Sequence, residues 1–170
     1  MAGKILIVED EMIVATDLRI LLEKNSYSVT GIARSFEKAV ELIRETRPDM
    51  VLLDIFLTGT LTGIDLAKKL KEDNIAFIFL SANANEEVLA AAKTTEPYGF
   101  IVKPFREKDL LVTLEIARYR HENSVESAYR KEERLQLQRE DIYAGSESYE
   151  SKLLKTGIAL QTYIPFDLLS

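Results

Sequence analysis

The sequence predicts an α/β fold in which a doubly wound parallel sheet is covered by helices on both faces. Three features of the chain predict it. Short apolar runs alternate along the chain with amphipathic segments that have the periodicity of helices. Most of these runs are almost continuously apolar, as strands buried on both faces are. The connections between them are short, which favours right-handed β–α–β units.

Five apolar runs are the expected strands. The second run is the weakest of them, whereas the others contain few polar residues. Proline residues agree with these boundaries, because Pro48 precedes the third run and Pro97 precedes the fifth. The expected strands cover residues 4–8, 27–32, 50–54, 76–81 and 98–103.

Amphipathic segments between and after these runs are the expected helices. Ser35 stands directly before the second segment and Asn85 before the fourth, and both residue types cap helix N-termini well. Each strand is therefore followed by one helix. The expected helices cover residues 12–24, 36–45, 63–72, 86–94 and 106–121.

Composition excludes several classes of function. The chain of 170 residues is long enough for one domain with a sizeable core and an appendage. A net charge of −6 argues against nucleic acid or a membrane surface as the main partner. With no cysteine and one histidine, a disulfide framework, a zinc site or a histidine-based catalytic triad has no support. No signal peptide or membrane-spanning run is present, so we expect a cytoplasmic protein.

The composition changes after about residue 121 and becomes polar, with charges of both signs. We therefore expect a domain in residues 1–121, a linker helix in residues 122–145, and a tail or the start of a further, truncated domain in residues 146–170. A seven-residue repeat hints that the linker helix is a coiled coil, but it is imperfect, so a solvated single helix is the alternative. The repeat consists of Leu114, His121, Ala128, Leu135 and Ile142.

Polar side chains stand where four of the expected strands end. Since the carboxyl ends of parallel strands meet at one edge of a sheet, these side chains are expected to lie together. An isolated, buried carboxylate would be costly, so Asp54 must be paired or have a function. The residues are Glu9, Asp10, Asp54, Ser81, Lys103 and Pro104.

These residue types indicate phosphoryl chemistry beside a metal ion. Neighbouring carboxylates repel one another, and a hard cation such as Mg²⁺ or Mn²⁺, which prefers oxygen ligands, removes the repulsion. An aspartate in such a place can attack phosphorus and form an aspartyl phosphate. The metal ion and a lysine would stabilise the charge on the transferring group.

Four motifs, IVEDE, LLDI, FLSANA and FIVKPF, occur in this order and at fitting spacing. Together they resemble the receiver domain of two-component response regulators, of the chemotaxis-regulator type, over roughly residues 3–121. The resemblance implies a flavodoxin-like (βα)5 fold with strand order 2-1-3-4-5. It also implies a signalling domain of a phosphorelay, rather than an enzyme, which accepts a phosphoryl group from a histidine kinase or a phosphotransfer protein.

The resemblance assigns roles to the acidic residues and to the lysine. Asp54 is the phosphoacceptor and also contacts the metal ion, Mg²⁺ or Mn²⁺. Asp10 corresponds to the direct metal ligand, and Glu9 to the acid that acts through a water molecule. The backbone carbonyl of Phe56 is the remaining protein ligand, and Lys103 contacts the phosphoryl group.

The resemblance also assigns a switch. Ser81 corresponds to the hydroxyl residue that approaches the phosphoryl group, and Ala82 to the small residue that leaves room for it. Phe100 corresponds to the aromatic residue that packs inward on phosphorylation. The Lys103–Pro104 peptide bond is expected to be cis. The switch would change the surface formed by the segments 86–94, 98–103 and 106–121.

The loop after the acceptor departs from the family pattern. Thr58 stands four residues past Asp54, where typical receivers have proline. Gly63 lies nine residues past Asp54, where the family glycine lies near eight, so the loop is one residue longer. We hypothesise that the bulky Phe56 shields the site from water and slows loss of the phosphoryl group.

Two other functions remain open. The domain could be a degenerate receiver that acts only as an interaction module, or a phosphatase with an aspartate nucleophile. The phosphatase wants a second acid two residues past the nucleophile, where this chain has Phe56. A homodimer through the switch surface or the linker helix is a further expectation. DNA binding is not expected, because residues 122–170 contain neither a helix-turn-helix pattern nor a basic patch.

Overall fold

The computed structural model describes residues 3–82 and 86–144, and it confirms the predicted α/β fold. Five parallel strands form one sheet in the order β2-β1-β3-β4-β5. The strands are β1 (Lys4–Val8), β2 (Ser28–Ala33), β3 (Met50–Asp54), β4 (Ala76–Ser81) and β5 (Gly99–Val102). The helices are α1 (Met12–Lys24), α2 (Phe36–Glu45), α3 (Gly63–Glu72), α4 (Glu86–Lys93) and α5 (Glu107–Ala144).

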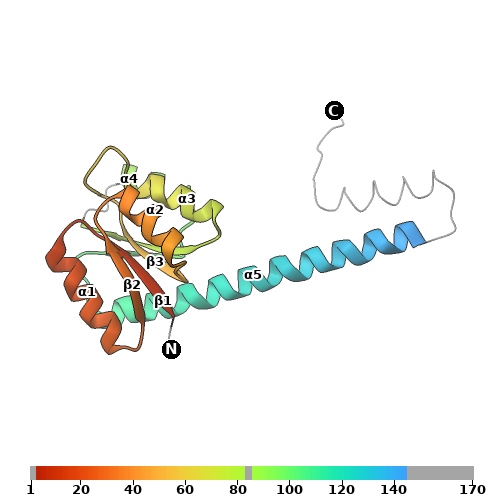
Figure 1. Cartoon of the computed structure of the whole chain (residues 1–170), viewed down its shortest axis with the longest axis horizontal. Helices are drawn as coiled ribbons and strands as arrows, with labels where there is room; N and C mark the ends of the chain where they lie inside the picture. Colours follow the sequence, from red (N-terminus) through yellow and green to blue (C-terminus); the bar gives the residue numbers. More distant parts are fainter. Residues whose placement is uncertain (1–2, 83–85, 145–170) are drawn as a thin grey trace. The chain divides into compact units, whose positions relative to one another are not determined.

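Helices cover both faces of the sheet (Figure 1). Successive residues of a strand point to opposite faces, so each strand contributes to two apolar clusters. Leu6, Leu53 and Phe79 belong to the cluster that α2, α3 and α4 complete. Ile7 and Leu52 belong to the cluster that α1 and α5 complete. The central strand β3 is therefore buried along its whole length, Asp54 included.

The helix boundaries follow from local sequence. The Ser35 hydroxyl accepts a hydrogen bond from the backbone N–H of Lys38, 3.3 Å away, which confirms the predicted N-cap of α2. Thr62 and Asp65 form a reciprocal capping box at the start of α3, which the sequence analysis did not identify. Asn85, the predicted cap of α4, lies outside the described residues.

The helix predicted at 106–121 runs on into the linker segment, as the sequence led us to expect. Helix α5 continues to Ala144, so it includes nearly all of the predicted linker helix. The chain divides into two units, residues 1–122 and 123–170, and residues 145–170 lie outside the described part. Leu114 is buried in the core of the first unit and is not available for a coiled-coil seam. The coiled coil stays a prediction for the rest of the repeat.

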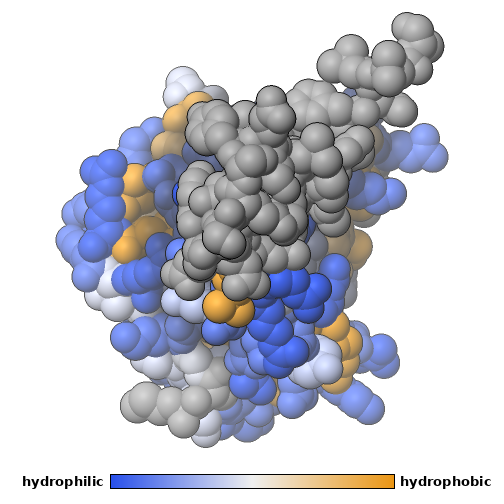
Figure 2. All heavy atoms as spheres, turned by 90° about the vertical axis from the view of Figure 1, so that its right-hand side faces the viewer, coloured by the Kyte–Doolittle hydropathy of each residue, from blue (hydrophilic) through white to orange (hydrophobic). Residues whose placement is uncertain are grey.

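Surface properties agree with the composition. No helix in the described parts of the chain is long and apolar enough to cross a membrane. On the face that Figure 2 shows, hydrophilic residues dominate, and apolar residues appear as small separate spots. Large exposed apolar side chains occur on α1, on β5 and on α5.

Candidate functional site

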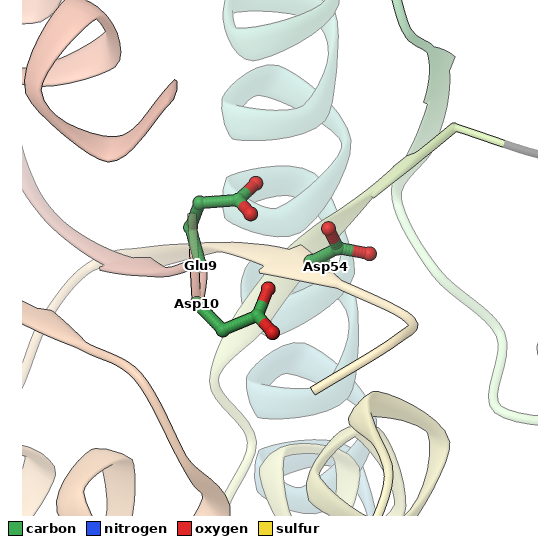
Figure 3. Close-up of side chains that lie close together, drawn as sticks. All are labelled: Glu9, Asp10 and Asp54. Carbon is green, nitrogen blue, oxygen red and sulfur yellow. The ribbon is translucent and has the colours of Figure 1, made fainter. Parts of the chain in front are cut away.

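Three carboxylates converge where β1 and β3 end, at the carboxyl edge of the sheet (Figure 3). One carboxylate oxygen each of Glu9, Asp10 and Asp54 lies within 4.8 Å of the other two. Glu9 is fully buried and Asp54 is 5% exposed, whereas Asp10 is half-buried. The sequence placed these residues at strand ends, and the parallel sheet brings them together.

Backbone hydrogen bonds of the sheet fix the positions of these acids. β1 pairs with β3, and Val8, directly before Glu9, lies opposite Leu53, directly before Asp54. The N–H of Glu9 donates to the carbonyl of Ala33 at the end of β2, at 2.9 Å. Because β1 pairs with both β2 and β3, the backbone that carries the Glu9 side chain is fixed by hydrogen bonds.

Lys103 joins the two most buried acids. Its Nζ lies 2.5 Å from Glu9 Oε2 and 2.6 Å from Asp54 Oδ2. The N–H of Lys103 donates to the Ser81 carbonyl at 2.8 Å, so β4 holds the lysine backbone. The cis peptide bond expected between Lys103 and Pro104 is present.

The pKa values of this cluster reflect burial and pairing. Burial raises the pKa of Glu9 above its usual value, and the negative charge of Asp54 raises it further, while the hydrogen bond from Lys103 only partly offsets these effects. Burial alone would lower the pKa of Lys103, but its hydrogen bonds to Asp54 and Glu9 raise it above the usual value. The lysine is therefore held in its charged form.

The cluster suits a hard divalent cation. Its donors are carboxylate oxygens, and Lys103 alone cannot balance the charges of Glu9, Asp10 and Asp54. The remaining negative charge lies in a largely buried place, where an additional cation would lower the electrostatic cost. The residues present thus fit the Mg²⁺ or Mn²⁺ that the sequence led us to expect.

Phe56 contributes to the site through its backbone. Its N–H donates to Asp54 Oδ1 at 2.9 Å, so the Asp54 carboxylate is held between this amide and Lys103. Phe56 is 51% exposed. The predicted roles of its carbonyl as a metal ligand and of its ring as a water shield stay predictions.

The two predicted switch residues lie on β4 and β5, and the residue predicted to leave room for the phosphoryl group lies just beyond β4. Ser81 is fully buried at the end of β4, next to Leu80, the register partner of Asp54. Ala82 follows it and is exposed. Phe100 is half-buried in β5, and its ring contacts Phe79 with centroids 6.1 Å apart. Their predicted roles in switching stay predictions.

The loop between β3 and α3 approaches the acceptor closely at Gly63. A Cβ atom on Gly63 would lie 2.0 Å from the backbone oxygen of Asp54, which no side chain tolerates. The Gly63 N–H also donates to the carbonyl of Ile55 at 2.9 Å. The glycine therefore lets the longer loop return to the strand end directly beside the acceptor.

Sequence reasoning missed Arg34 in this region. Its Nε donates to the backbone carbonyl of Asp10 at 3.1 Å, and its own carbonyl accepts a hydrogen bond from the Thr58 hydroxyl at 3.1 Å. The available signal was its place directly after β2, at the same edge of the sheet as the acids.

Together, a parallel sheet in the order 2-1-3-4-5 and an acid cluster with a bridging lysine at its carboxyl edge define a receiver-type signalling domain. Residues 5–115 match the response regulator receiver domain, and the chain belongs to this family of two-component signalling proteins.

Individual relatives agree with this assignment. The chain is 31% identical to the transcriptional regulatory protein PdtaR of Mycobacterium tuberculosis over 115 residues, which are 67% of this chain and 56% of PdtaR. It is 30% identical to the transcriptional regulatory protein MalR of Bacillus subtilis over 162 residues, which are 93% of this chain and 67% of MalR. The chain thus spans little more than half of PdtaR.

A solved structure supports the same fold. The signal receiver domain of a modulated diguanylate cyclase from Desulfovibrio desulfuricans G20 superimposes with a TM-score of 0.68 at 34% identity. The match covers 72% of this chain and 98% of that chain. The part in common is the receiver domain, and the similarity says nothing about an output.

Proposed function

We propose that this chain is a phosphorylation-controlled receiver in which Asp54 accepts a phosphoryl group from a histidine kinase or a phosphotransfer protein. One observation carries the proposal. The carboxylate of Asp54 lies at the carboxyl edge of the sheet, paired with Lys103 and within 4.8 Å of carboxylate oxygens of Glu9 and Asp10. A purely structural carboxylate would need one partner and no surplus of negative charge around it.

The transfer reaction follows from this arrangement. A carboxylate oxygen of Asp54 attacks the phosphorus of a phosphohistidine, and an O–P bond forms as the P–N bond breaks. The electron pair of the broken bond stays on the ring nitrogen of the donor. A ring that carries a proton on its other nitrogen leaves as neutral imidazole. In the unphosphorylated chain, Lys103 donates a hydrogen bond to Asp54 Oδ2. It is therefore close enough to donate to an oxygen of the incoming phosphoryl group.

A divalent cation, Mg²⁺ or Mn²⁺, would be held by Asp10, Asp54 and the Phe56 carbonyl, and by Glu9 through a water molecule. When bound, it would neutralise negative charge on the phosphoryl oxygens and on the cluster. The amide of Phe56 and the ammonium of Lys103 meanwhile keep the Asp54 carboxylate oriented.

Signal output would depend on a shift between two conformations. A phosphoryl group on Asp54 adds charge and acceptor oxygens beside Ser81, and Ala82 leaves room for them. Ser81 and Lys103 would then gain partners that exist only in the phosphorylated state, and Phe100 would follow. The surface of α4, β5 and α5 would change, including the exposed Val102, Val112, Ile116 and Tyr119.

Partners and output are part of this proposal. The changed surface, or the part of α5 beyond residue 121, would bind a second copy or another protein rather than nucleic acid. We place the protein in the cytoplasm, where its phosphodonor would be found. Residues 146–170 would belong to a tail or to the output. The phosphatase alternative is disfavoured, because Phe56 replaces the second acid that such an enzyme needs.

The test is phosphorylation with acetyl phosphate and Mg²⁺, followed by mass spectrometry of the intact chain. The expected result is the addition of one phosphoryl group to the wild type and none to Asp54→Asn. Asp17→Asn is the matched control, because Asp17 is an exposed aspartate on α1 away from the cluster. A wild type without an adduct would favour the degenerate, interaction-only receiver, and an adduct on Asp54→Asn would exclude Asp54 as the acceptor.

A further inference from the structure

Three segments at the carboxyl edge of the sheet are joined through Arg34. The segment after β1 carries Asp10, Arg34 directly follows β2, and the segment after β3 carries Thr58. Arg34 Nε donates to the Asp10 carbonyl, and the Arg34 carbonyl accepts from the Thr58 hydroxyl, each at 3.1 Å. We call this pair of hydrogen bonds the Arg34 bridge.

The loop after Asp54 has few other attachments. Thr58, Gly59 and Thr60 are exposed, and Gly59 has a φ of +126° with no atom within 4 Å of the position of a Cβ. Among the described residues, the hydroxyl of Thr58 makes the only hydrogen bond that joins loop residues 57–61 to another segment. The stiffness that proline would supply at this position is absent, so beyond the packing of Leu57 against the core the loop is held to its neighbours by this contact.

The same loop presents the backbone next to the acceptor. It leaves β3 at Asp54, passes Phe56, whose amide holds Asp54 Oδ1, and returns at Gly63. At the other end of the bridge, the Asp10 carbonyl belongs to the residue whose carboxylate completes the acid cluster. The bridge therefore connects the segment after β1 with the segment after β3, and both segments would have to be correctly placed for their ligands to bind one cation.

We propose that Arg34 and Thr58 are positioning residues, which hold the loop after Asp54 against the Asp10 segment and so set the affinity of the acid cluster for Mg²⁺. This inference rests on the proposed role of the cluster as a cation site. Neither side chain would touch the cation or the phosphoryl group. Their effect comes from fixing, before binding, the distance between ligands that lie on separate loops.

Calorimetric titration of the unphosphorylated chain with MgCl₂ tests the bridge. Thr58→Val keeps the shape of the side chain and removes the donor, while Arg34→Lys keeps the positive charge and an aliphatic stem and removes Nε. Each is expected to weaken Mg²⁺ binding by roughly two- to tenfold, the size of effect that one hydrogen bond has. Because both bonds belong to one bridge, the double variant is expected to lose less than the product of the two effects.

Two matched controls isolate the hydrogen bond. Thr58→Ser keeps the hydroxyl, and Thr60→Val makes the same chemical change at an exposed threonine two residues away in the loop. Both are expected to bind Mg²⁺ as the wild type does, and all variants are expected to be fully folded without Mg²⁺, which far-UV circular dichroism measures. Equal affinity of Thr58→Val and wild type would overturn the proposal, as would an equal loss in Thr60→Val.

The titration also separates this inference from the proposed function. If Mg²⁺ binds and Thr58→Val weakens it while Asp54 accepts no phosphoryl group, the bridge stands and the phosphoacceptor role fails. If phosphorylation occurs on Asp54 and Thr58→Val leaves Mg²⁺ affinity unchanged, the phosphoacceptor role stands and the bridge fails. If the wild type binds Mg²⁺ no better than Asp10→Asn, the bridge has no cation site to position and is rejected.

Discussion

The two edges of the sheet carry charged residues in different ways. At the carboxyl edge, Glu9 and Asp54 are buried and share one lysine, so the charges do not balance locally. At the amino edge, polar groups are more exposed and have their own partners. Arg118 pairs with Glu122 at 3.4 Å, and Arg47 donates to the carbonyl of Asp73 at 2.6 Å.

Of the two edges, the carboxyl edge is the one whose charges call for a ligand. The amino edge has a hollow of about 390 Å³, whose lining includes Tyr27, Arg47, Arg118 and His121. Its volume lies within the range of small-molecule binding sites. However, exposed pairs such as Arg118 with Glu122 contribute little and need no further partner. The carboxyl edge carries a cluster of acids that is largely buried and not balanced by its lysine, and such a charge is costly unless something binds it.

Removal of Lys103 is expected to have the largest effect on the carboxyl edge. In buffer without divalent cations, Lys103→Met leaves Glu9 and Asp54 buried without a cation, and we expect a loss of about 3 kcal/mol in the free energy of unfolding. Denaturant titration measures it. Added Mg²⁺ is expected to recover part of the loss, because the cluster then regains a positive charge.

Lys38→Met is the control for Lys103→Met. Lys38 pairs with Glu41 on the exposed face of α2 at 2.9 Å, and both side chains are about half exposed. Its replacement is expected to leave the unfolding midpoint unchanged. Equal losses from the two replacements would show that the buried cluster carries no special electrostatic cost.

Gly63 provides the next test of the carboxyl edge. Gly63→Ala would place a methyl group 2.0 Å from the backbone oxygen of Asp54, and we expect a loss of about 2–3 kcal/mol. Gly59→Ala meets open space and is strained only by its φ of +126°, so a loss of about 1 kcal/mol is expected. Denaturant titration measures the unfolding free energy of both variants. A larger loss for Gly63→Ala than for Gly59→Ala would show that close packing beside the acceptor matters more than the backbone conformation of the glycine.

The strands could be predicted well from the sequence, because a strand that is buried on both faces requires apolar residues at nearly every position. β3 and β4 are buried along their whole length and appear in the sequence as unbroken apolar runs. The weak second run became β2, which is the edge strand and is half-exposed over most of its length. Its polar residues therefore reflect its place in the sheet rather than an error in the interpretation.

Contacts of side chains could not be predicted in the same way. Strand ends located Glu9, Asp54 and Lys103 at one edge, but not that the lysine would bridge the two acids. The Arg34 bridge depends on backbone carbonyls, which carry no residue-specific signal. The composition beyond residue 121 indicated that the fifth helix runs on into the linker, but not where it ends, since periodicity fades where a helix stops packing on a core.

Arg47 tests the amino edge, where a smaller effect is expected. Its guanidinium caps the end of α3 by donating to the carbonyls of Asp73 and Asn74, at 2.6 and 3.4 Å. Arg47→Gln is expected to lower the free energy of unfolding by about 1 kcal/mol. Arg44→Gln, an exposed change in the last turn of α2, is the control and is expected to have no measurable effect. A larger loss at Arg47 than at Lys103 would reverse our ranking of the two edges.

His121 gives the smallest and most local test of the amino edge. Its Nδ1 lies 3.1 Å from the Tyr98 hydroxyl, and the two rings pack edge to face. Burial lowers the pKa of His121 below the usual 6.5, the carboxylate of Glu122 opposes this shift, and the charge of Arg47 adds to it. Because the chain has one histidine, its NMR titration is unambiguous.

We expect the measured pKa of His121 to lie below 6.5 and to rise in Arg47→Gln, since that variant removes a neighbouring positive charge. The sign of the stability effect follows from linkage. Between the lowered folded pKa and 6.5, the unfolded chain binds more protons than the folded chain, so the stabilisation is complete above pH 6.5 and is lost as the pH falls through the folded value. His121→Gln is expected to lose this part of the pH dependence. A His121 pKa above 6.5 would mean that Glu122, and not burial, dominates its surroundings, and that charge at the amino edge is less balanced than the geometry indicates.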